Sequence, residues 1–425
     1  MKLSDEDRKK LDGAEGAAVQ EALAYLVKLG EAFEADEMVD LHSCHVFGDY
    51  HTIGEGGLQL YAKFAEMGAK VRVRSSVEPI SMDLRLWPRL NLPTEYPGMQ
   101  IRINNALREM DFCLDYTCIF HLTQNVPRYG ENLAWIEGNA TAWANSLTGA
   151  RGNRENSITC FLAGIAGRIP RHGLLDPRNR KGQRLVEVEP GLVRQLIGQG
   201  RSTADLGVLG MTIADLGYDR IPVVTGVPPL LTNEQMKAIF TCCGPVLTTA
   251  LMLLVGISPE APTMEAAFGG PIPSGIEKQQ IGMKDIRAGY EKLTNARKFD
   301  VDIVSTGCPF KTIYEIQETA KLLDGKKVKD NILFLVHTDF TTWHLAWEMG
   351  LIEKIEKSGA LVTRDLCPFS LPIEDMYGPE KVVATDSFKT VRLLAGEGKP
   401  QYCFGTLSDC VDAAVTGTFE STRWG

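Results

Sequence analysis

The stretch DVDIVSTGCPFKTIYEIQETAKLLDG, residues 300–325, decides the fold. It begins with a short apolar run typical of a buried strand and ends with a helical pattern that puts Ile313, Ile316 and Ala320 on one face. The alternation continues downstream, where strands are expected at DNILFLVHT, GALVT, KVVAT and PQYCFG, with helices between and after them. Apolar strands that alternate with helices predict the α/β class, with a doubly wound, mostly parallel sheet in the C-terminal part of the chain.

The N-terminal part has a less regular pattern. Two helices are expected at its start, the first capped by Ser4 or Asp5. A helix and then a strand over residues 70–73 are expected in EGGLQLYAKFAEMGAKVRVRSS, and AWIEGNATAWANSLTGA predicts a helix that ends at Gly149. The polar stretch RIPRHGLLDPRNRKGQ indicates a loop.

Length and charge limit the kinds of function. A chain of 425 residues is long enough for two or three domains. Its formal net charge of −9 argues against nucleic acid or an anionic membrane as the main partner, because phosphate binding needs a positive field. The opening residues carry no secretory signal, and the longest apolar run, VLTTALMLLVGI, is shorter than the ~20 residues that span a bilayer. We therefore expect a cytoplasmic protein that binds neither nucleic acid nor membrane.

Two of the ten cysteines occupy the same local pattern. Cys308 and Cys367 each follow an expected strand and each precede a proline. Ligands of parallel sheets collect at the carboxyl ends of the strands, and a cysteine at a helix N-terminus is favoured as thiolate. Both cysteines are therefore candidates for a functional site, and we expect thiolate character for them.

Three interpretations of this cysteine pair remain open. Both side chains could pack silently in tight turns, because cysteine is often fully buried. One of them could be a nucleophile, although that does not explain a matched pair. Thiolates also suit an iron–sulfur or other metal site, but two are too few, so a third ligand should lie elsewhere. The segment DFCLDYTCIF offers Cys113 and Cys118, of which Cys118 ends a strand-like run.

Polar side chains gather in two further segments. Arg151 and Arg154 lie near Gly149 and Gly152 on an expected flexible loop, where two guanidinium groups could clamp a carboxylate or phosphate. A plain solvated loop is the alternative. The histidines of LHSCHVFGDYHTIGEGG have a spacing that suits a loop lining a pocket, and a structural role fits equally well.

Several segments together resemble a known family, the large catalytic subunit of aconitase X, a hydro-lyase branch of the aconitase superfamily. The resemblance runs over nearly the whole chain. It is carried by KLSDEDRKKLDG, YHTIGEGGLQLYAKFAEMGAKVRVRSS, YTCIFHLTQNVPRYGENLAWIEGNATAWANSLTGARGNRE, VSTGCPF, RDLCPFSLPIEDM and VVATDSFKT. Each segment alone is weak, but their ordered combination is specific.

The resemblance implies an aconitase-like multidomain arrangement. Residues 1–290 would form an N-terminal region of two interleaved α/β domains and residues 291–425 a C-terminal α/β domain, without the small swivelling domain of the superfamily. In the family three cysteines hold an iron–sulfur cluster, whose open iron is a Lewis acid for the substrate. These ligands fall on Cys118, Cys308 and Cys367. Three cysteines can hold clusters with different numbers of iron atoms, so the nuclearity stays open. We expect their sulfurs to meet at one point that faces a cleft.

The resemblance also implies a reaction, a partner and substrate-binding residues. The reaction is the dehydration of a small hydroxy acid, and the catalytic base is expected on a small swivelling-domain subunit. Residues matching the family's substrate-facing segments are Asn145, Ser146, Arg151, Asn153, Arg154 and Glu155, together with His51, Thr52 and Gly54.

Departures from the family pattern concern the substrate. Cys118 is followed by Ile, Phe and His121 instead of Thr, Pro and Tyr, and Gly152 replaces a threonine. The family's known enzymes act on cis-3-hydroxy-L-proline or on mevalonate 5-phosphate, and those of the second kind are archaeal. Ten cysteines are untypical of a hyperthermophilic protein, so we expect the chain to be of the cis-3-hydroxy-L-proline dehydratase type. The alternatives are the large subunit of a mevalonate 5-phosphate dehydratase and a catalytically silent iron–sulfur-binding member.

Overall fold

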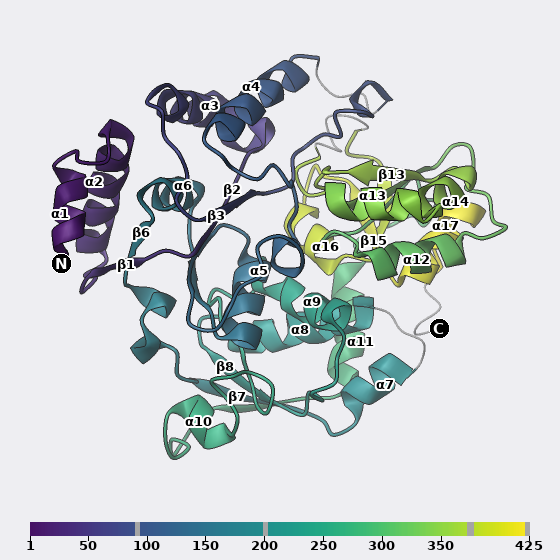
Figure 1. Ribbon diagram of the computed structural model, residues 1–425. Coiled ribbons are helices and arrows are strands. Elements are labelled where there is room, and N and C mark those ends of the chain that lie inside the picture. The colour runs from purple at the N-terminus through teal and green to yellow at the C-terminus, as the bar shows by residue number, and fades with distance from the viewer. Residues whose placement is uncertain (90–93, 199–202, 372–377, 421–425) are drawn as a thin grey trace.

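The computed structural model describes residues 1–89, 94–198, 203–371 and 378–420. Three sheets of parallel strands follow one another along the chain, and helices surround them (Figure 1). No helix within these ranges is both long and apolar enough to cross a membrane. Residues 372–376, the end of one segment that carries the family resemblance, lie outside the described ranges.

The first sheet has the strand order β3-β2-β4-β5, and all its neighbours are parallel. Helix α6 packs so closely on β2 that a side chain at Gly164 would lie 3.0 Å from Cys44 Sγ. The elements of this region are α1 (Asp5–Leu11), α2 (Ala17–Ala32), β1 (Met38–Asp40), β2 (Ser43–Val46), α3 (Tyr50–Glu66), β3 (Arg74–Val77), α4 (Tyr96–Glu109), β4 (Asn132–Trp135), α5 (Gly138–Trp143), β5 (Arg151–Arg154), α6 (Ser157–Ala166) and β6 (Arg168–Pro170).

The second sheet has the order β10-β7-β8-β9 and is also parallel throughout. Its largest helix, α8, packs against α9. The elements are β7 (Arg184–Val188), α7 (Leu192–Gly198), α8 (Thr203–Gly217), β8 (Pro222–Thr225), α9 (Asn233–Phe240), β9 (Leu253–Leu254), α10 (Met264–Phe268), β10 (Lys278–Ile281) and α11 (Met283–Leu293).

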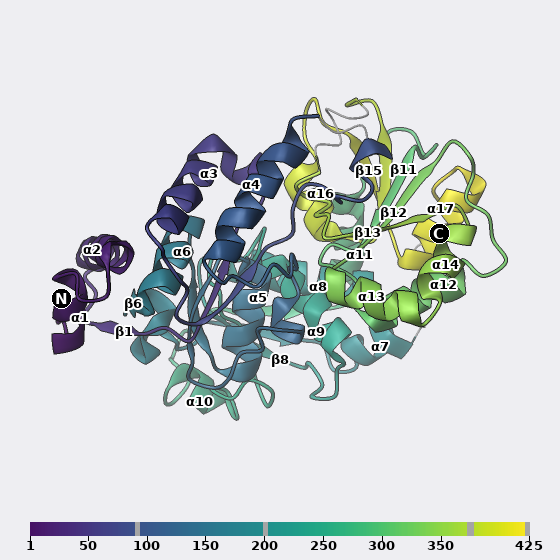
Figure 2. The same ribbon diagram turned by 45° about the horizontal axis from the view of Figure 1, so that its top comes forward.

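The third sheet confirms the expected doubly wound, parallel arrangement, with the order β13-β12-β11-β14-β15. From β11 the chain adds β12 and β13 on one side of the sheet and then β14 and β15 on the other, so that helices cover both faces. Figure 2 shows the strands of this sheet fanned between the helices. The elements are β11 (Ile303–Thr306), α12 (Ile313–Leu322), β12 (Leu333–Thr338), α13 (Phe340–Glu348), α14 (Leu351–Lys357), β13 (Leu361–Arg364), β14 (Val382–Thr385), α16 (Phe388–Leu394), β15 (Gln401–Phe404) and α17 (Leu407–Thr416).

One expectation for the N-terminal part is confirmed and one is wrong. Ser4 caps α1 and exchanges hydrogen bonds with Asp7 in a capping box. The strand expected over residues 70–73 lies instead at Arg74–Val77. The preceding residues bond elsewhere, because Val71 N–H donates to Met110 and Arg72 N–H donates to Gly164.

Local contacts also correct three boundaries. The helix expected to end at Gly149 does so, but it begins only at Gly138, because β4 extends to Trp135 and Glu137 is the N-cap. Residues 151–154 form strand β5 and not a flexible loop, because they pair in parallel with β4. The loop expected after residue 167 contains a short strand, β6, that pairs with β1.

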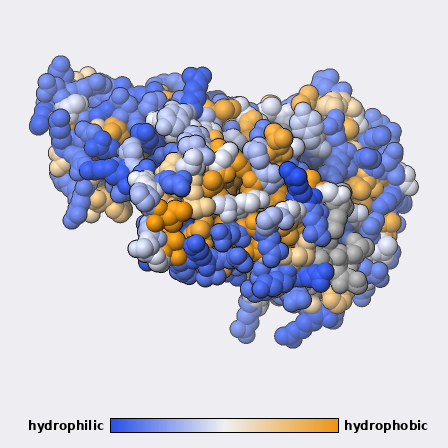
Figure 3. All heavy atoms as spheres, turned by 90° about the horizontal axis from the view of Figure 1, so that it is seen from below, coloured by the Kyte–Doolittle hydropathy of each residue, from blue (hydrophilic) through white to orange (hydrophobic). Residues whose placement is uncertain are grey.

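Apolar side chains form one large core that runs through the first two sheets and reaches β14 and β15, and a separate core inside the third sheet region. The domain boundary expected near residue 290 remains a prediction. On the face shown in Figure 3, apolar side chains gather in the middle and hydrophilic side chains surround them.

Two glycine substitutions should have opposite effects on stability. A methyl group at Gly210 in α8 would lie 2.0 Å from the Ile239 carbonyl oxygen of α9, so Gly210→Ala should cost about 1–3 kcal/mol through overpacking. Gly56 in α3 has no neighbour within 4 Å of that position, so Gly56→Ala should gain about 0.5–1 kcal/mol. Urea unfolding midpoints compare the two variants, and equal midpoints would contradict the close α8–α9 packing.

Candidate active site

The three cysteines expected to act together line one hollow, which we call the cysteine hollow. Glu78, Glu137 and Lys389 line it as well. Its walls come from the carboxyl ends of two sheets. Phe47, Glu78 and Glu137 follow strands β2, β3 and β4 of the first sheet, and Cys118 lies in the same region, before β4. Cys308, Cys367 and Lys389 follow strands β11, β13 and β14 of the third sheet. The hollow encloses about 520 Å³ of space, including its part open to solvent.

Main-chain contacts hold each cysteine in this place. Cys308 follows Gly307, whose φ of +103° and close approach to the His337 carbonyl oxygen leave no room for a side chain. Cys367 N–H donates to the Ile80 carbonyl at 2.8 Å, which ties the turn after β13 to the first sheet region. Cys118 Sγ accepts a hydrogen bond from Phe310 N–H at 3.3 Å.

The thiolate character expected of Cys308 and Cys367 is wrong. Helix α12 begins only at Ile313, so Cys308 and its proline lie outside its first turn. Burial raises the pKa of Cys118 and of Cys308, and it raises the pKa of Cys367 to about 12. All three thiols are therefore neutral, and a metal that binds them must displace their protons.

The three thiols are candidate donors for two kinds of metal centre, a single ion and a cluster. Among the described residues, no three Cys, His, Asp or Glu side chains are arranged to hold one metal ion, so the expected meeting of the sulfurs at one point is not seen. Three soft thiols around one hollow nevertheless fit an iron–sulfur cluster, because its cysteines bind different irons and need not converge on one point.

Two carboxyl groups and one ammonium form the charged part of the hollow. Lys389 Nζ lies 3.1 and 3.2 Å from the two Glu137 oxygens. Burial alone would raise the pKa of Glu137, but the Lys389 charge, a hydrogen bond with Glu78 and the Asn139 N–H lower it to about 2. Burial and the Glu137 charge raise the pKa of Glu78 well above its ordinary value. Glu78 is therefore a protonated acid beside an ionised carboxylate.

A chain of buried hydrogen bonds leads to Glu78 and has a fixed direction. It begins at Trp135, whose indole N–H can only donate and does so to Ser43 Oγ at 2.7 Å. Ser43 then donates to Asn125 Oδ1, and Asn125 Nδ2 donates to Ser76 Oγ.

The same direction is the basis for assigning the tautomer of His45. Ser76 Oγ lies 2.7 Å from His45 Nδ1. Because Ser76 already accepts from Asn125, we assign its hydroxyl proton to His45 Nδ1, which puts the single ring proton on Nε2. His45 Nε2 lies 2.6 Å from Glu78 Oε2. Burial lowers the pKa of His45 well below its ordinary value, so the ring is neutral and donates one hydrogen bond to Glu78.

Asn145 and Ser146 lie in the core, away from the cysteine hollow. Asn145 donates to the Gly152 and Ala250 carbonyls and accepts from Gly152 N–H and Arg180, so all four hydrogen bonds of its amide are made within the protein. Ser146 accepts from Met252 N–H. Both residues join the first sheet region to the segment around β9.

Strand β5 separates the two arginines of the expected clamp. Side chains alternate along a strand, so Arg151 and Arg154 point to opposite faces, and the expected clamp is not formed. Arg154 donates to the Leu247 and Gly244 carbonyls and touches the start of α5 at Gly138. Asn153 binds Glu155 and the loop at residues 172–174.

The segment of His51, Thr52 and Gly54 forms the first turns of α3. Thr52 donates to Asp49, which caps the helix, and Gly54 interrupts it with a φ of +58°. His51 and Thr52 are exposed. Neither this segment nor β5 is among the described walls of the cysteine hollow, so their binding of substrate remains a prediction.

Glu78, Glu137 and Lys389 were missed by sequence reasoning, whereas His45 belongs to the histidine segment expected to line a pocket and lies on strand β2 instead of a loop. Two of the missed residues could have been found by the rule that found the cysteines, because Glu78 directly follows strand β3 and Glu137 lies just beyond β4. His121, noted as a departure near Cys118, is buried, and burial lowers its pKa to about 3, so it is neutral.

Parallel α/β sheets whose strand ends gather thiols, acids and a lysine define an enzyme site, and comparisons with known proteins identify the enzyme. Models of the first, second and third domains of aconitase X match residues 1–177, 182–291 and 301–416. The crystal structure of Thermococcus kodakaraensis aconitase X (holo-form) superposes with a TM-score of 0.83 at 27% identity, covering 97% of this chain and 100% of that one.

Curated relatives are of two kinds. The phosphomevalonate dehydratase large subunit of Methanocaldococcus jannaschii is 31% identical over 96% of this chain and 99% of that protein. The cis-3-hydroxy-L-proline dehydratase of Hypocrea jecorina is 28% identical over 99% of this chain and 70% of that protein. The chain belongs to the aconitase X family and is a hydro-lyase, as the sequence resemblance implied.

Removing Lys389 alone should destabilise the protein more than removing both charges of its ion pair. Lys389→Met leaves the Glu137 carboxylate buried without its cation, which should cost about 3–5 kcal/mol at pH 7. Lys389→Met combined with Glu137→Gln should recover most of this loss. The gap should shrink as the pH falls, because Glu137 without its lysine takes up a proton. Urea unfolding of both variants measures the gap, and equal losses at pH 7 would contradict the assigned charges.

Proposed function

We propose that this chain is the large subunit of an iron–sulfur-dependent dehydratase of a small hydroxy acid, with Cys118, Cys308 and Cys367 as the cluster ligands. The observation that carries the proposal is their shared hollow, whose walls also hold an acid, a carboxylate and a lysine. A bound cluster with an open iron would supply a Lewis acid for the hydroxyl and carboxylate of the substrate.

Glu78 is proposed as the acid that protonates the leaving hydroxyl. Dehydration removes a hydroxyl from one carbon and a proton from its neighbour, and the hydroxyl leaves as water only when it receives a proton. Glu78 holds such a proton, and its second oxygen accepts from His45 Nε2–H, which keeps the carboxyl in one orientation. Lys389 keeps Glu137 ionised beside it.

The removal of the carbon-bound proton is assigned to a small partner subunit. Relatives such as those of Methanocaldococcus jannaschii and Methanothermobacter thermautotrophicus are named large subunits, which supports a second chain here. We place both in the cytoplasm, where the ten cysteines stay reduced.

The charge of the hollow favours cis-3-hydroxy-L-proline as the substrate. This amino acid carries one carboxylate and one ammonium, and the hollow offers one ammonium, Lys389, and one carboxylate, Glu137. The substrate carboxylate can pair with Lys389 and its ammonium with Glu137, so that no net charge is left buried.

Mevalonate 5-phosphate is the second candidate. The names of the relatives support it, since the chain covers 99% of the Methanocaldococcus jannaschii large subunit and 94% of the Methanothermobacter thermautotrophicus one. This substrate carries a carboxylate and a phosphate, and it would need further cationic groups beyond the one lysine of the hollow.

The test of this function is an assay of the chain reconstituted anaerobically with iron and sulfide, together with its small subunit. We expect dehydration of cis-3-hydroxy-L-proline and none by the large chain alone. Dehydration of mevalonate 5-phosphate alone would establish the second candidate. A cluster spectrum without turnover of either compound would show a catalytically silent member or a third substrate.

A single substitution tests the role of Glu78. Glu78→Gln keeps the shape of the side chain but cannot release a proton, so kcat should fall by about 10²–10⁴-fold while iron content stays unchanged. Glu31→Gln, on the exposed surface of α2, is the matched control and should retain full activity. A kcat for Glu78→Gln within about threefold of the wild-type value would show that another group is the acid.

A further inference from the structure

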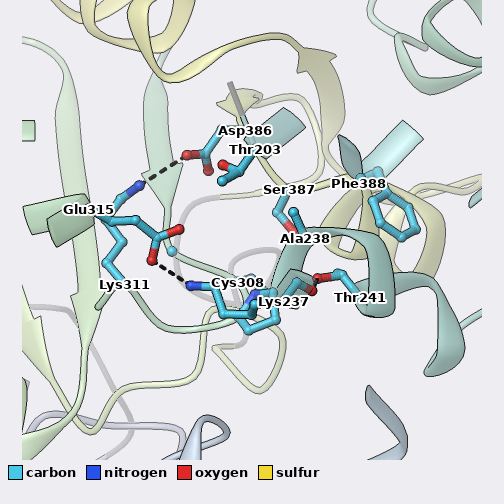
Figure 4. A pocket seen from close by; sticks show the side chains of 13 residues that line it. Thr203, Lys237, Ala238, Thr241, Cys308, Lys311, Glu315, Asp386, Ser387 and Phe388 are labelled. Carbon is cyan, nitrogen blue, oxygen red and sulfur yellow. Dashed lines mark hydrogen bonds and ion pairs between the residues drawn. The ribbon is translucent and has the colours of Figure 1, made fainter. Parts of the chain in front are cut away.

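A second hollow adjoins the cysteine hollow. It shares Gly307 and Cys308 with the cysteine hollow and is also lined by Lys237, Lys311 and Glu315. Figure 4 shows two ion pairs across it, Lys311 with Asp386 and Lys237 with Glu315. These four side chains are nearly or fully buried, so both pairs are shielded from water.

Lys237 makes one contact that an ion pair alone does not require. Its Nζ lies 2.5 Å from Glu315 Oε2 and donates a second hydrogen bond, of 2.7 Å, to the Phe310 carbonyl oxygen. Glu315 already accepts from Thr312 N–H in the capping box of α12. The ammonium therefore binds the loop at Phe310 in addition to the helix behind it.

A second residue of α9 holds the same loop. Glu234 lies one helical turn from Lys237 and accepts a hydrogen bond from Thr312 Oγ1 at 3.0 Å. Helix α9 belongs to the second sheet region, whereas residues 307–312 belong to the third. One helix thus holds both ends of the segment from Phe310 to Thr312.

Phe310 is the residue through which this contact reaches the cysteine hollow. Its carbonyl binds Lys237, and its N–H donates to Cys118 Sγ at 3.3 Å. N–H donors to cysteine sulfur raise the reduction potential of an iron–sulfur cluster and stabilise its ligands. The position of Phe310 therefore affects two ligands: Cys118, which accepts its hydrogen bond, and Cys308, which lies on the same loop.

We propose that Lys237 is a positioning residue of the metal centre: it holds Phe310 so that the N–H···S bond to Cys118 is kept and Cys308 stays in place. The inference rests on the proposed function, because it concerns the same three cysteines. It adds a residue from the second sheet region, which contributes no wall to the cysteine hollow among the described residues.

The test compares Lys237→Met with Lys311→Met in the reconstituted protein. Both variants lose one buried positive charge from the second hollow, but only Lys237 binds Phe310. In Lys237→Met the midpoint potential of the cluster should move to a more negative value, and iron should be lost to a chelator about 10-fold faster. Lys311→Met should change neither quantity by as much.

The outcomes separate the two proposals. If both variants shift the potential equally, the effect does not depend on the Lys237–Phe310 contact and the positioning role is wrong. If the wild-type chain takes up no iron, the metal centre and the role of Lys237 are both wrong. Should Lys237→Met fail to fold, Glu234→Gln, which weakens the contact with Thr312, should shift the potential in the same direction by less. An unchanged potential in that variant would overturn the inference.

Discussion

The structure depends on the meeting of the carboxyl ends of two parallel sheets. The join is a short main-chain pairing, in which Ile80 N–H donates to Asp365 and Cys367 N–H donates to Ile80. It brings the residues after β3 and the residues after β13 into one wall. Because parallel strands all end at the same edge of their sheet, two such edges face to face concentrate functional groups from distant parts of the sequence.

Burial gives these groups their chemical states. The three thiols and two histidines, His45 and His121, are neutral because charge is costly without water, and one lysine stabilises a single carboxylate, Glu137. The remaining acid, Glu78, keeps its proton. The donor-only indole of Trp135 sets the direction of the hydrogen bonds that orient this acid, so a residue of the core determines which atom of the site carries a proton.

Much of this arrangement could be predicted from the sequence, and the failures have physical causes. The strand-end rule found Cys308 and Cys367, and the same rule would have found Glu78 and Glu137 had it been applied to carboxyl groups. Arg151–Arg154 was expected to be a loop because of its glycines, whereas pairing with β4 makes it a strand. Long-range contacts such as those of Asn145 with Arg180, or Lys237 with Phe310, leave no local pattern.

The central claim, that Cys118, Cys308 and Cys367 hold one iron–sulfur cluster between the two sheet edges, is tested most directly by anomalous diffraction at the iron absorption edge from anaerobically reconstituted crystals. The claim predicts a single iron-containing peak in the cysteine hollow, with density continuous to all three sulfurs. Iron bound elsewhere, or a peak that leaves any of the three cysteines without a bond to it, would contradict the claim.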